Sequence, residues 1–201
     1  MMKRYLMAAI LAVCLLLTMT ACGVQAEPAP TPIVLNESST YFADIEIKDY
    51  GTVTVQLDQH AAPVTVSNFL NLANVGYYDG LTFHRIIAGF MMQGGAPTSV
   101  ETMSDSIVGE FAANGYNNPI PHVRGVISMA RGQDYNSANS QFFIMHKDYP
   151  SLNGGYAAFG YVTEGMEVVD VICEAARPID KNGIIAAEER PVITKITVRI
   201  E

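Results

Sequence analysis

One segment of the chain places a permanent cation and an amide within a run of apolar residues. Residues 83–95 read Phe-His-Arg-Ile-Ile-Ala-Gly-Phe-Met-Met-Gln-Gly-Gly, and they include Arg85 and Gln93. A guanidinium cannot lose its proton, so it must be partnered or lie at a wet edge. The alternation is typical of a β-strand and predicts that Phe83, Arg85 and Ile87 share one face. Taken alone, the segment is a core strand whose Arg85 extends outward to water.

Two further segments favour a chemical role for Arg85. Residues 125–131 read Gly-Val-Ile-Ser-Met-Ala-Arg, and residues 140–144 read Ser-Gln-Phe-Phe-Ile. In this order and spacing, the three segments together resemble the cyclophilin family of peptidyl-prolyl cis-trans isomerases. The resemblance extends from about Tyr41 to Glu201.

The resemblance implies a substrate groove with one catalytic residue, Arg85. A hydrophobic pocket would grip the proline ring, Gln93 would bond the substrate backbone, and the backbone of Ala130 and Arg131 would hold the extended peptide. His84 would lie at the edge of this groove. No cofactor and no metal are implied. The residues that would contact the substrate are His84, Phe90, Met91, Gln93, Ala130, Arg131, Gln141, Phe143, Leu152 and Tyr156.

Rotation about an X-Pro bond makes and breaks no covalent bond, so a well-placed donor can catalyse it. The barrier of about 18–20 kcal/mol is the amide resonance that is lost as the C–N bond twists. Twisting localises the lone pair of the prolyl nitrogen, which then becomes a better hydrogen-bond acceptor. A donor aimed at that nitrogen, such as Arg85, therefore stabilises the transition state more than either planar state.

Several positions leave details of the groove open. Phe142 and Phe143 alternate faces on a strand, and we assign Phe143 to the groove. Leu152 fits either the pocket or the core. Many eukaryotic cyclophilins carry tryptophan just before this leucine and histidine further along, where this chain has Ser151 and Tyr156. We therefore expect isomerase activity together with weak binding of cyclosporin.

Motifs of other enzyme classes are missing from the sequence. It contains no GxSxG, HExxH, CxxC or GxxxxGK[ST] motif, and its four histidines lack metal-ligand spacing. Two alternatives to an isomerase remain open. One is a non-catalytic chaperone or adhesin module that binds proline-containing peptides, and the other is a purely structural envelope protein. The presence of both Arg85 and Gln93 favours the enzyme.

Residues 1–21 are predicted to be a signal peptide. Two basic residues precede an apolar stretch, 7–17, that is too short to span a bilayer as a helix. The sequence around Cys22, Thr-Ala-Cys-Gly, resembles a bacterial lipobox. It predicts a lipidated Cys22 that anchors the protein to the outer face of the bacterial cytoplasmic membrane. Because a methionine stands where leucine is usual, ordinary cleavage to a secreted or periplasmic protein is the alternative.

Residues 22–39 are predicted to be the lipidated N-terminus and a proline-rich linker. Within them, 27–32 alternates proline with small residues, which is typical of an extended spacer, although a proline-rich ligand motif is the alternative. The net charge of −8 disfavours nucleic acid and a polybasic grip on anionic lipid. We expect a monomer that binds proline-containing unfolded or exported polypeptides and contacts the membrane through its lipid anchor only.

Residues 40–201 are long enough for one well-filled core. Apolar residues at helical spacing predict two helices, at 63–75 and 166–175. The resemblance implies a mainly β domain, a closed eight-stranded antiparallel β-barrel capped by these two α-helices. Short alternating segments between Gly, Asn and Pro clusters predict strands at 41–47, 52–57, 81–87, 90–93, 126–130, 142–145, 157–162 and 192–200.

The three cysteines predict no disulfide. Cys14 lies in the apolar stretch of the signal peptide and Cys22 at the proposed anchor, which leaves Cys173 alone in the folded domain. No histidine or cation lies near Cys173 in sequence to lower its pKa. We therefore interpret Cys173 as a buried structural thiol.

Overall fold

The structure of the chain is a computed structural model that describes residues 30–101 and 103–201. The predictions for residues 1–21, for Cys22 and for the first part of the linker lie outside the described residues. Within these two ranges, no helix is long and apolar enough to cross a membrane. In chain order, the elements are β1 (Tyr41–Ile47), β2 (Gly51–Leu57), α1 (Pro63–Asn74), β3 (Phe83–Ile87), β4 (Met91–Gly94), η1 (Ala112–Asn114), β5 (Val126–Met129), β6 (Phe142–Met145), η2 (Pro150–Leu152), β7 (Ala157–Glu164), α2 (Met166–Ala175), η3 (Ala187–Glu189) and β8 (Ile193–Ile200).

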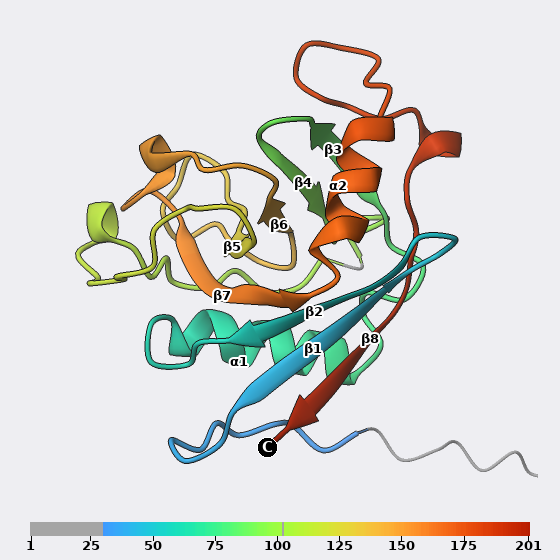
Figure 1. Ribbon diagram of the computed structural model, residues 1–201. Helices are drawn as coiled ribbons and strands as arrows, with labels where there is room; N and C mark the ends of the chain where they lie inside the picture. Colours follow the sequence, from blue (N-terminus) through green and yellow to red (C-terminus); the bar gives the residue numbers. More distant parts are fainter. Residues whose placement is uncertain (1–29, 102) are drawn as a thin grey trace, which may run out of the picture.

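The eight strands form one antiparallel sheet that curls around the core (Figure 1). The strand order is β3-β4-β6-β5-β7-β2-β1-β8. Alternation of apolar and polar residues explains why these segments pair as strands. In β1, for example, every second side chain is fully buried, and these are Tyr41, Ala43, Ile45 and Ile47. A mainly β domain with eight antiparallel strands and two helices is thereby confirmed.

The sheet is a half-barrel whose end strands meet only over a short stretch. An isolated antiparallel bridge joins Thr82 to Val192, just before β3 and β8 begin. Beside it, the Ile193 amide donates to the Leu81 carbonyl at 2.8 Å. No longer ladder joins β3 to β8 in the described part of the chain. The predicted barrel is therefore present in its strands and helices, but the structure does not show it closed.

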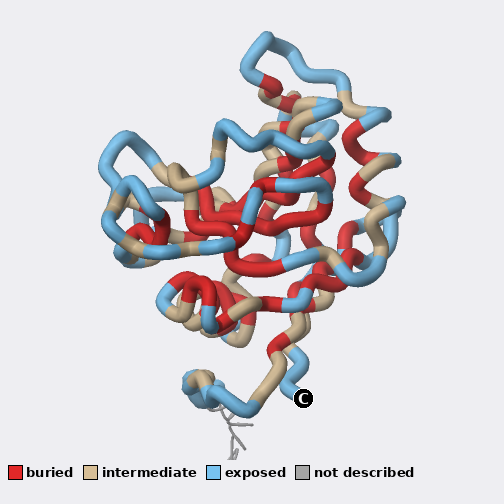
Figure 2. The backbone as a smooth tube through the Cα atoms, turned by 60° about the vertical axis from the view of Figure 1, so that its left-hand side comes forward, coloured by how far each residue is buried: buried red, intermediate tan, exposed pale blue. Residues whose placement is uncertain are grey.

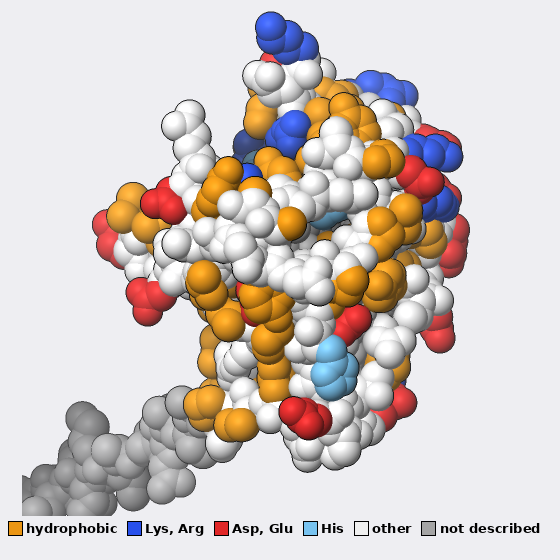
Figure 3. All heavy atoms as spheres, turned by 90° about the vertical axis from the view of Figure 1, so that its left-hand side faces the viewer, with side chains coloured by type: hydrophobic (Ala, Val, Ile, Leu, Met, Phe, Trp, Pro, Cys, Tyr) orange, Lys and Arg blue, Asp and Glu red, His pale blue; other side chains and the backbone are white. Residues whose placement is uncertain are grey.

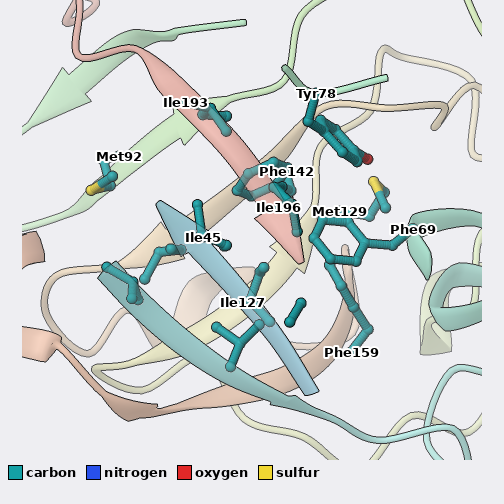
Figure 4. Packing of buried hydrophobic residues seen from close by; sticks show 14 of the residues in the cluster. Ile45, Phe69, Tyr78, Met92, Ile127, Met129, Phe142, Phe159, Ile193 and Ile196 are labelled. Carbon is teal, nitrogen blue, oxygen red and sulfur yellow. The ribbon is translucent and has the colours of Figure 1, made fainter. Parts of the chain in front are cut away.

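The two helices lie on opposite sides of the curled sheet (Figure 1), and both bury one face. The ring of Phe69 on α1 lies 5.2 to 5.4 Å, between ring centroids, from three other buried rings. These rings form the centre of the core (Figure 4), and they belong to Tyr78, Phe142 and Phe159. Figure 2 shows that the exposed backbone lies mainly in the loops that connect these elements.

The predicted burial of Cys173 is confirmed, and the residue lies on the buried face of α2. Its side chain is 1% exposed and belongs to the main core. Burial disfavours the thiolate and raises the pKa of Cys173 to about 12. The thiol is therefore neutral and structural.

A carboxylate from a distant loop caps the first turn of α1. The residue before the helix, Ala62, has no side chain that can accept a hydrogen bond. Buried Glu110 accepts from the amides of Val64 and Thr65 at 2.9 and 2.8 Å, and from the Thr65 hydroxyl at 2.7 Å. This carboxylate satisfies amides that a helix start otherwise leaves unpaired, and its charge suits the positive end of the helix dipole.

Residues 31–39 form a strap along α1, although they fall within the predicted linker. The backbone amide of Ile33 donates to Asn71 Oδ1 at 2.7 Å, and Asn71 Nδ2 donates back to the Ile33 carbonyl at 3.1 Å. Ile33 and Leu35 also pack against the main core. Further along, the Asn36 amide donates to the hydroxyl of Tyr41 at 2.7 Å. The strap is thus bound to the domain by both polar and apolar contacts.

Simple alternation along 192–200 would place Val192, Thr194 and Ile196 on one face of the strand, and this is wrong in the first half. Ile193 and Ile196 are both buried, whereas Thr194 and Lys195 are exposed. The register between β1 and β8 shifts at this point: Ile193 pairs with Ile47, whereas Lys195, two residues on, pairs with the adjacent Glu46. Thr194 is the extra residue of a β-bulge, which returns the apolar side chains to the core.

Candidate functional site

A β-bulge in β3 directs Arg85 away from the main core. Phe83 pairs with Gly94 and Arg85 pairs with Gln93, so a step of two residues on β3 matches a step of one on β4. Phe83 is fully buried in the main core, while Arg85 is half-buried. The predicted common face of Phe83, Arg85 and Ile87 is therefore wrong for Phe83, because simple alternation assumes a regular ladder.

Hydrogen bonds on two sides fix the guanidinium of Arg85. Its Nε donates to the backbone carbonyl of Asn182 at 2.7 Å, and its Nη1 donates to Gln93 Oε1 at 3.2 Å. Its carbon lies 5.9 Å from the centroid of the Phe90 ring. Gln93 is held in turn, because its Nε2 donates to Gln141 Oε1 at 3.1 Å. No hydrogen bond joins Nη2 to a described residue, which leaves that end of the fork available.

The turn that supplies the Asn182 carbonyl is itself rigid. Asp180 Oδ1 accepts from the amides of Asn182 and Ile184, both at 3.0 Å. These amides, that of Ile184 first, lower the pKa of Asp180. Gly183 has φ +88° and packs against Ile87, so a side chain there would be strained and would also clash. No local pattern in the sequence connects this turn to Arg85, which lies 97 residues away.

Arg85 lies beside a pocket of about 160 Å³. The pocket collects residues from β3, β4, β6 and the segments after β5 and β6. Nine of the residues expected at the site line it. Leu152, for which the sequence left pocket and core open, is one of them. The lining is Arg85, Phe90, Met91, Gln93, Ala130, Arg131, Phe143, Leu152 and Tyr156.

A second, smaller apolar cluster forms the floor of the pocket. Met91 and Phe143 belong to it, whereas Phe142 belongs to the main core on the other face of β6. The ring of Phe143 packs edge-on against Tyr156, with centroids 5.7 Å apart. Behind Phe143 lies the buried ring of His122, stacked at 6.0 Å. Phe143 lines the pocket and Phe142 does not, which is consistent with the assignment of Phe143 to the groove.

Two other expected site residues lie outside this lining. Gln141 touches the site through its hydrogen bond to Gln93. The half-buried His84 does not line the pocket, and its Nδ1 is buried without a hydrogen-bond partner. Burial, reinforced by the charge of Arg190, lowers the pKa of His84.

Arg131 lines the pocket, and three aromatic rings lie around its guanidinium. Its Nε donates to the Gly155 carbonyl and its Nη1 to the Gly132 carbonyl, both at 2.9 Å. Its guanidinium carbon lies between 4.8 and 5.0 Å from the centroids of three rings, those of Phe111, Tyr135 and Tyr156. The side chain is thus held in place by cation–π contacts as well as hydrogen bonds.

Comparison with known proteins places the chain in one family. Residues 42–198 match the family model described as cyclophilin type peptidyl-prolyl cis-trans isomerase/CLD. The chain is 45% identical over 122 residues to peptidyl-prolyl cis-trans isomerase B of Bacillus subtilis, an alignment that covers 60% of this chain and 82% of that protein.

Solved structures agree with this assignment. A cyclophilin type peptidyl-prolyl cis-trans isomerase of Cryptosporidium parvum superposes with a TM-score of 0.68 at 28% identity, covering 80% of this chain and 98% of that one. The structure of the same protein in the presence of the dipeptide Ala-Pro gives 0.67 at 29% identity, covering 79% and 98%. The chain therefore belongs to the cyclophilin-type peptidyl-prolyl cis-trans isomerases.

Proposed function

We propose that this isomerase acts outside the cytoplasm, where a lipid on Cys22 anchors it to the outer face of a bacterial cytoplasmic membrane. There it accelerates rotation about X-Pro bonds in exported polypeptides, as a monomer. The short apolar stretch 7–17 and the lipobox-like sequence at Cys22 support the export step. The observation that carries the catalytic part is the fixed guanidinium of Arg85 at the edge of an apolar pocket.

In this proposal the pocket holds the proline ring while the acyl part rotates. Phe90, Met91, Phe143 and Leu152 supply the apolar surface. The free Nη2 end of Arg85 donates to the prolyl nitrogen as its lone pair localises. Because Asn182 and Gln93 already hold the other nitrogens, the donor needs no reorganisation at the transition state.

In this proposal, one hydrogen bond from Arg85 is too weak to account for the whole reduction of the barrier, so the pocket must contribute the rest. Shortening a reaction time from tens of seconds to milliseconds is a gain of about 10⁴-fold, or about 5.5 kcal/mol. One hydrogen bond from a charged donor contributes about 1.5–3 kcal/mol. The remainder must come from holding the ring and the flanking backbone. The Cryptosporidium relative was crystallised with Ala-Pro, which supports a proline-containing ligand for this pocket too.

NMR exchange spectroscopy on an Ala-Pro or Phe-Pro peptide tests the catalytic part. The protein should be the chain from Gly23 onward, so that the strap is retained. We expect cis and trans signals to exchange far faster than in buffer. Peptide binding without faster exchange would favour the alternative, a non-catalytic chaperone or adhesin module that uses the same groove.

Mass spectrometry of the protein from bacterial membranes tests the anchor. We expect a mature N-terminus at Cys22 that carries lipid, and a Cys22→Ala variant that is released or left unprocessed. An unmodified N-terminus at any other residue would overturn the lipoprotein assignment and support simple secretion.

A further inference from the structure

The pocket carries a second fixed positive charge that the rotation step does not use. Arg131 lines the pocket, and the aromatic rings of Phe111, Tyr135 and Tyr156 lie around its guanidinium. Its Nε and Nη1 are bound to backbone carbonyls, whereas its Nη2 makes no hydrogen bond to a described residue. Arg131 therefore keeps a donor that no described residue uses.

No carboxylate of the described residues neutralises either guanidinium of the pocket. The ion pairs found in residues 30–101 and 103–201 involve Arg124, His146 and Arg199, and none involves Arg85 or Arg131. The nine lining residues include no Asp or Glu. The chain as a whole is acidic, with a net charge of −8. In Figure 3, the basic side chains of the visible face lie in its upper half, while acidic ones lie along the sides and lower part.

We propose that Arg131 makes this isomerase selective for X-Pro bonds flanked by acidic residues. This inference rests on the proposed use of the pocket by the substrate. A peptide whose proline fills the pocket passes next to Ala130 and Arg131, so a carboxylate within two residues of the proline reaches the free Nη2. A lysine in the same place meets two uncompensated cations. Rigid placement by the three rings means that little side-chain entropy is lost when the carboxylate binds.

The test compares peptides that differ only in charge beside the proline. In one series the two residues before the proline are both Glu, both Gln or both Lys, and in the other series the two residues after it vary in the same way. NMR exchange gives kcat/KM for each peptide, relative to its own uncatalysed rate. The enzymes are wild type, Arg131→Gln, Arg131→Lys and Arg177→Gln, and the last removes an exposed charge that lies just after α2 and outside the pocket.

With wild type at low salt, we expect the Glu peptide to exceed the Lys peptide by about fivefold in at least one series. The ratio should fall to below about twofold in Arg131→Gln and in about 0.5 M salt. It should be retained in Arg131→Lys and in Arg177→Gln. The neutral Gln peptides report isomerase activity itself, so a failure of the proposed function would appear there as an unchanged exchange rate.

Two results would overturn the inference while leaving the isomerase intact. One is an equal Glu-to-Lys ratio in wild type and Arg131→Gln. The other is an equal loss in Arg131→Gln and Arg177→Gln, which would show that only the net charge of the protein matters.

Discussion

In the proposed mechanism, Arg85 meets two requirements, since a donor for catalysis must be free and a charge among apolar residues must be partnered. Different nitrogens of the one guanidinium meet these two requirements. Nε and Nη1 are bound to Asn182 and Gln93, and Nη2 makes no hydrogen bond to a described residue, although Arg85 lines the pocket. The planar fork of arginine makes this division possible, because its nitrogens point in fixed and different directions.

Arg85→Ala should lower kcat/KM by at least about tenfold, which is the range expected for one hydrogen bond from a charged donor. The side chain is half-buried and outside the main core, so the thermal midpoint should change by less than about 3 °C. NMR exchange and thermal unfolding measure the two quantities. Arg85→Lys, which keeps the charge but loses the fork, should recover only part of the rate. An unchanged rate in Arg85→Ala would contradict the mechanism, and a large drop in the midpoint would make Arg85 structural.

Ser151 is exposed on η2, directly before the pocket residue Leu152. It lacks the aromatic surface and the N–H donor of the tryptophan found in many eukaryotic relatives, and loss of such an anchor costs several kcal/mol. We expect cyclosporin to inhibit this protein at least about 100-fold more weakly than tryptophan-bearing relatives. Ser151→Trp should regain part of the affinity, while Val171→Trp, on the exposed face of α2, should regain none. Nanomolar inhibition of the wild type would contradict this expectation.

At the scale of elements, α1 depends on a residue outside its own sequence. Its N-terminal amides are satisfied by Glu110, which lies 46 residues from Val64. A carboxylate that accepts three hydrogen bonds in a buried site cannot be replaced by an amide without loss. The amide has one acceptor oxygen, and its NH₂ group would face the amides of the helix.

Glu110→Gln should therefore lower the free energy of unfolding by about 1.5–3 kcal/mol, or the thermal midpoint by roughly 4–10 °C. Glu167→Gln is the matched control, because Glu167 also lies in the first turn of a helix but is exposed. Denaturant unfolding of both variants measures the difference. Equal effects in the two variants would show that the charge near a helix start matters and the buried hydrogen bonds do not.

Elements defined by local periodicity could be predicted from the sequence, and contacts between distant segments could not. The range of β1 and the helical spacing of Val66, Phe69 and Leu70 reflect one buried face, so the sequence alone shows them. The bulge at Thr194 depends on how β8 pairs with β1, which no local pattern contains. For the same reason the Asn182 carbonyl and the Glu110 cap were missed.

For the molecule as a whole, a buried histidine, His122, and a half-buried one, His84, make stability depend on pH. Burial lowers the pKa of His122 and of His84 below the ordinary value of 6.5. The folded state therefore binds fewer protons than the unfolded state as the pH falls below about 6.5. The stability due to the neutral rings is complete above that pH and is lost as the pH falls through the lower pKa of the folded state.

We expect the thermal midpoint to fall between about pH 7.5 and pH 5. His122→Gln should make this fall smaller, because one proton-linked group is removed, even if the midpoint itself is lower at every pH. His60→Gln is the control, since His60 is exposed. Thermal unfolding across this pH range gives the slopes. An equal slope in wild type and His122→Gln would exclude His122 as a source of the pH dependence.

In the proposed lipoprotein, the strap also limits how far the enzyme can reach from the membrane. It runs along α1 at the end of the molecule remote from β3 and β4 (Figure 1), which carry Arg85 and Gln93. With residues 31–39 bound to the domain, the segment 23–30 separates Cys22 from the strap, and a fully extended chain of that length reaches at most roughly 25 Å at 3.1 Å per residue. A lipid on Cys22 would then hold the domain close to the bilayer, with its α1 end towards the lipid and its pocket outward. Such an enzyme would act on polypeptides that approach from the side facing away from the membrane. The distance that it could reach from the membrane would depend on whether the strap stays bound to the domain.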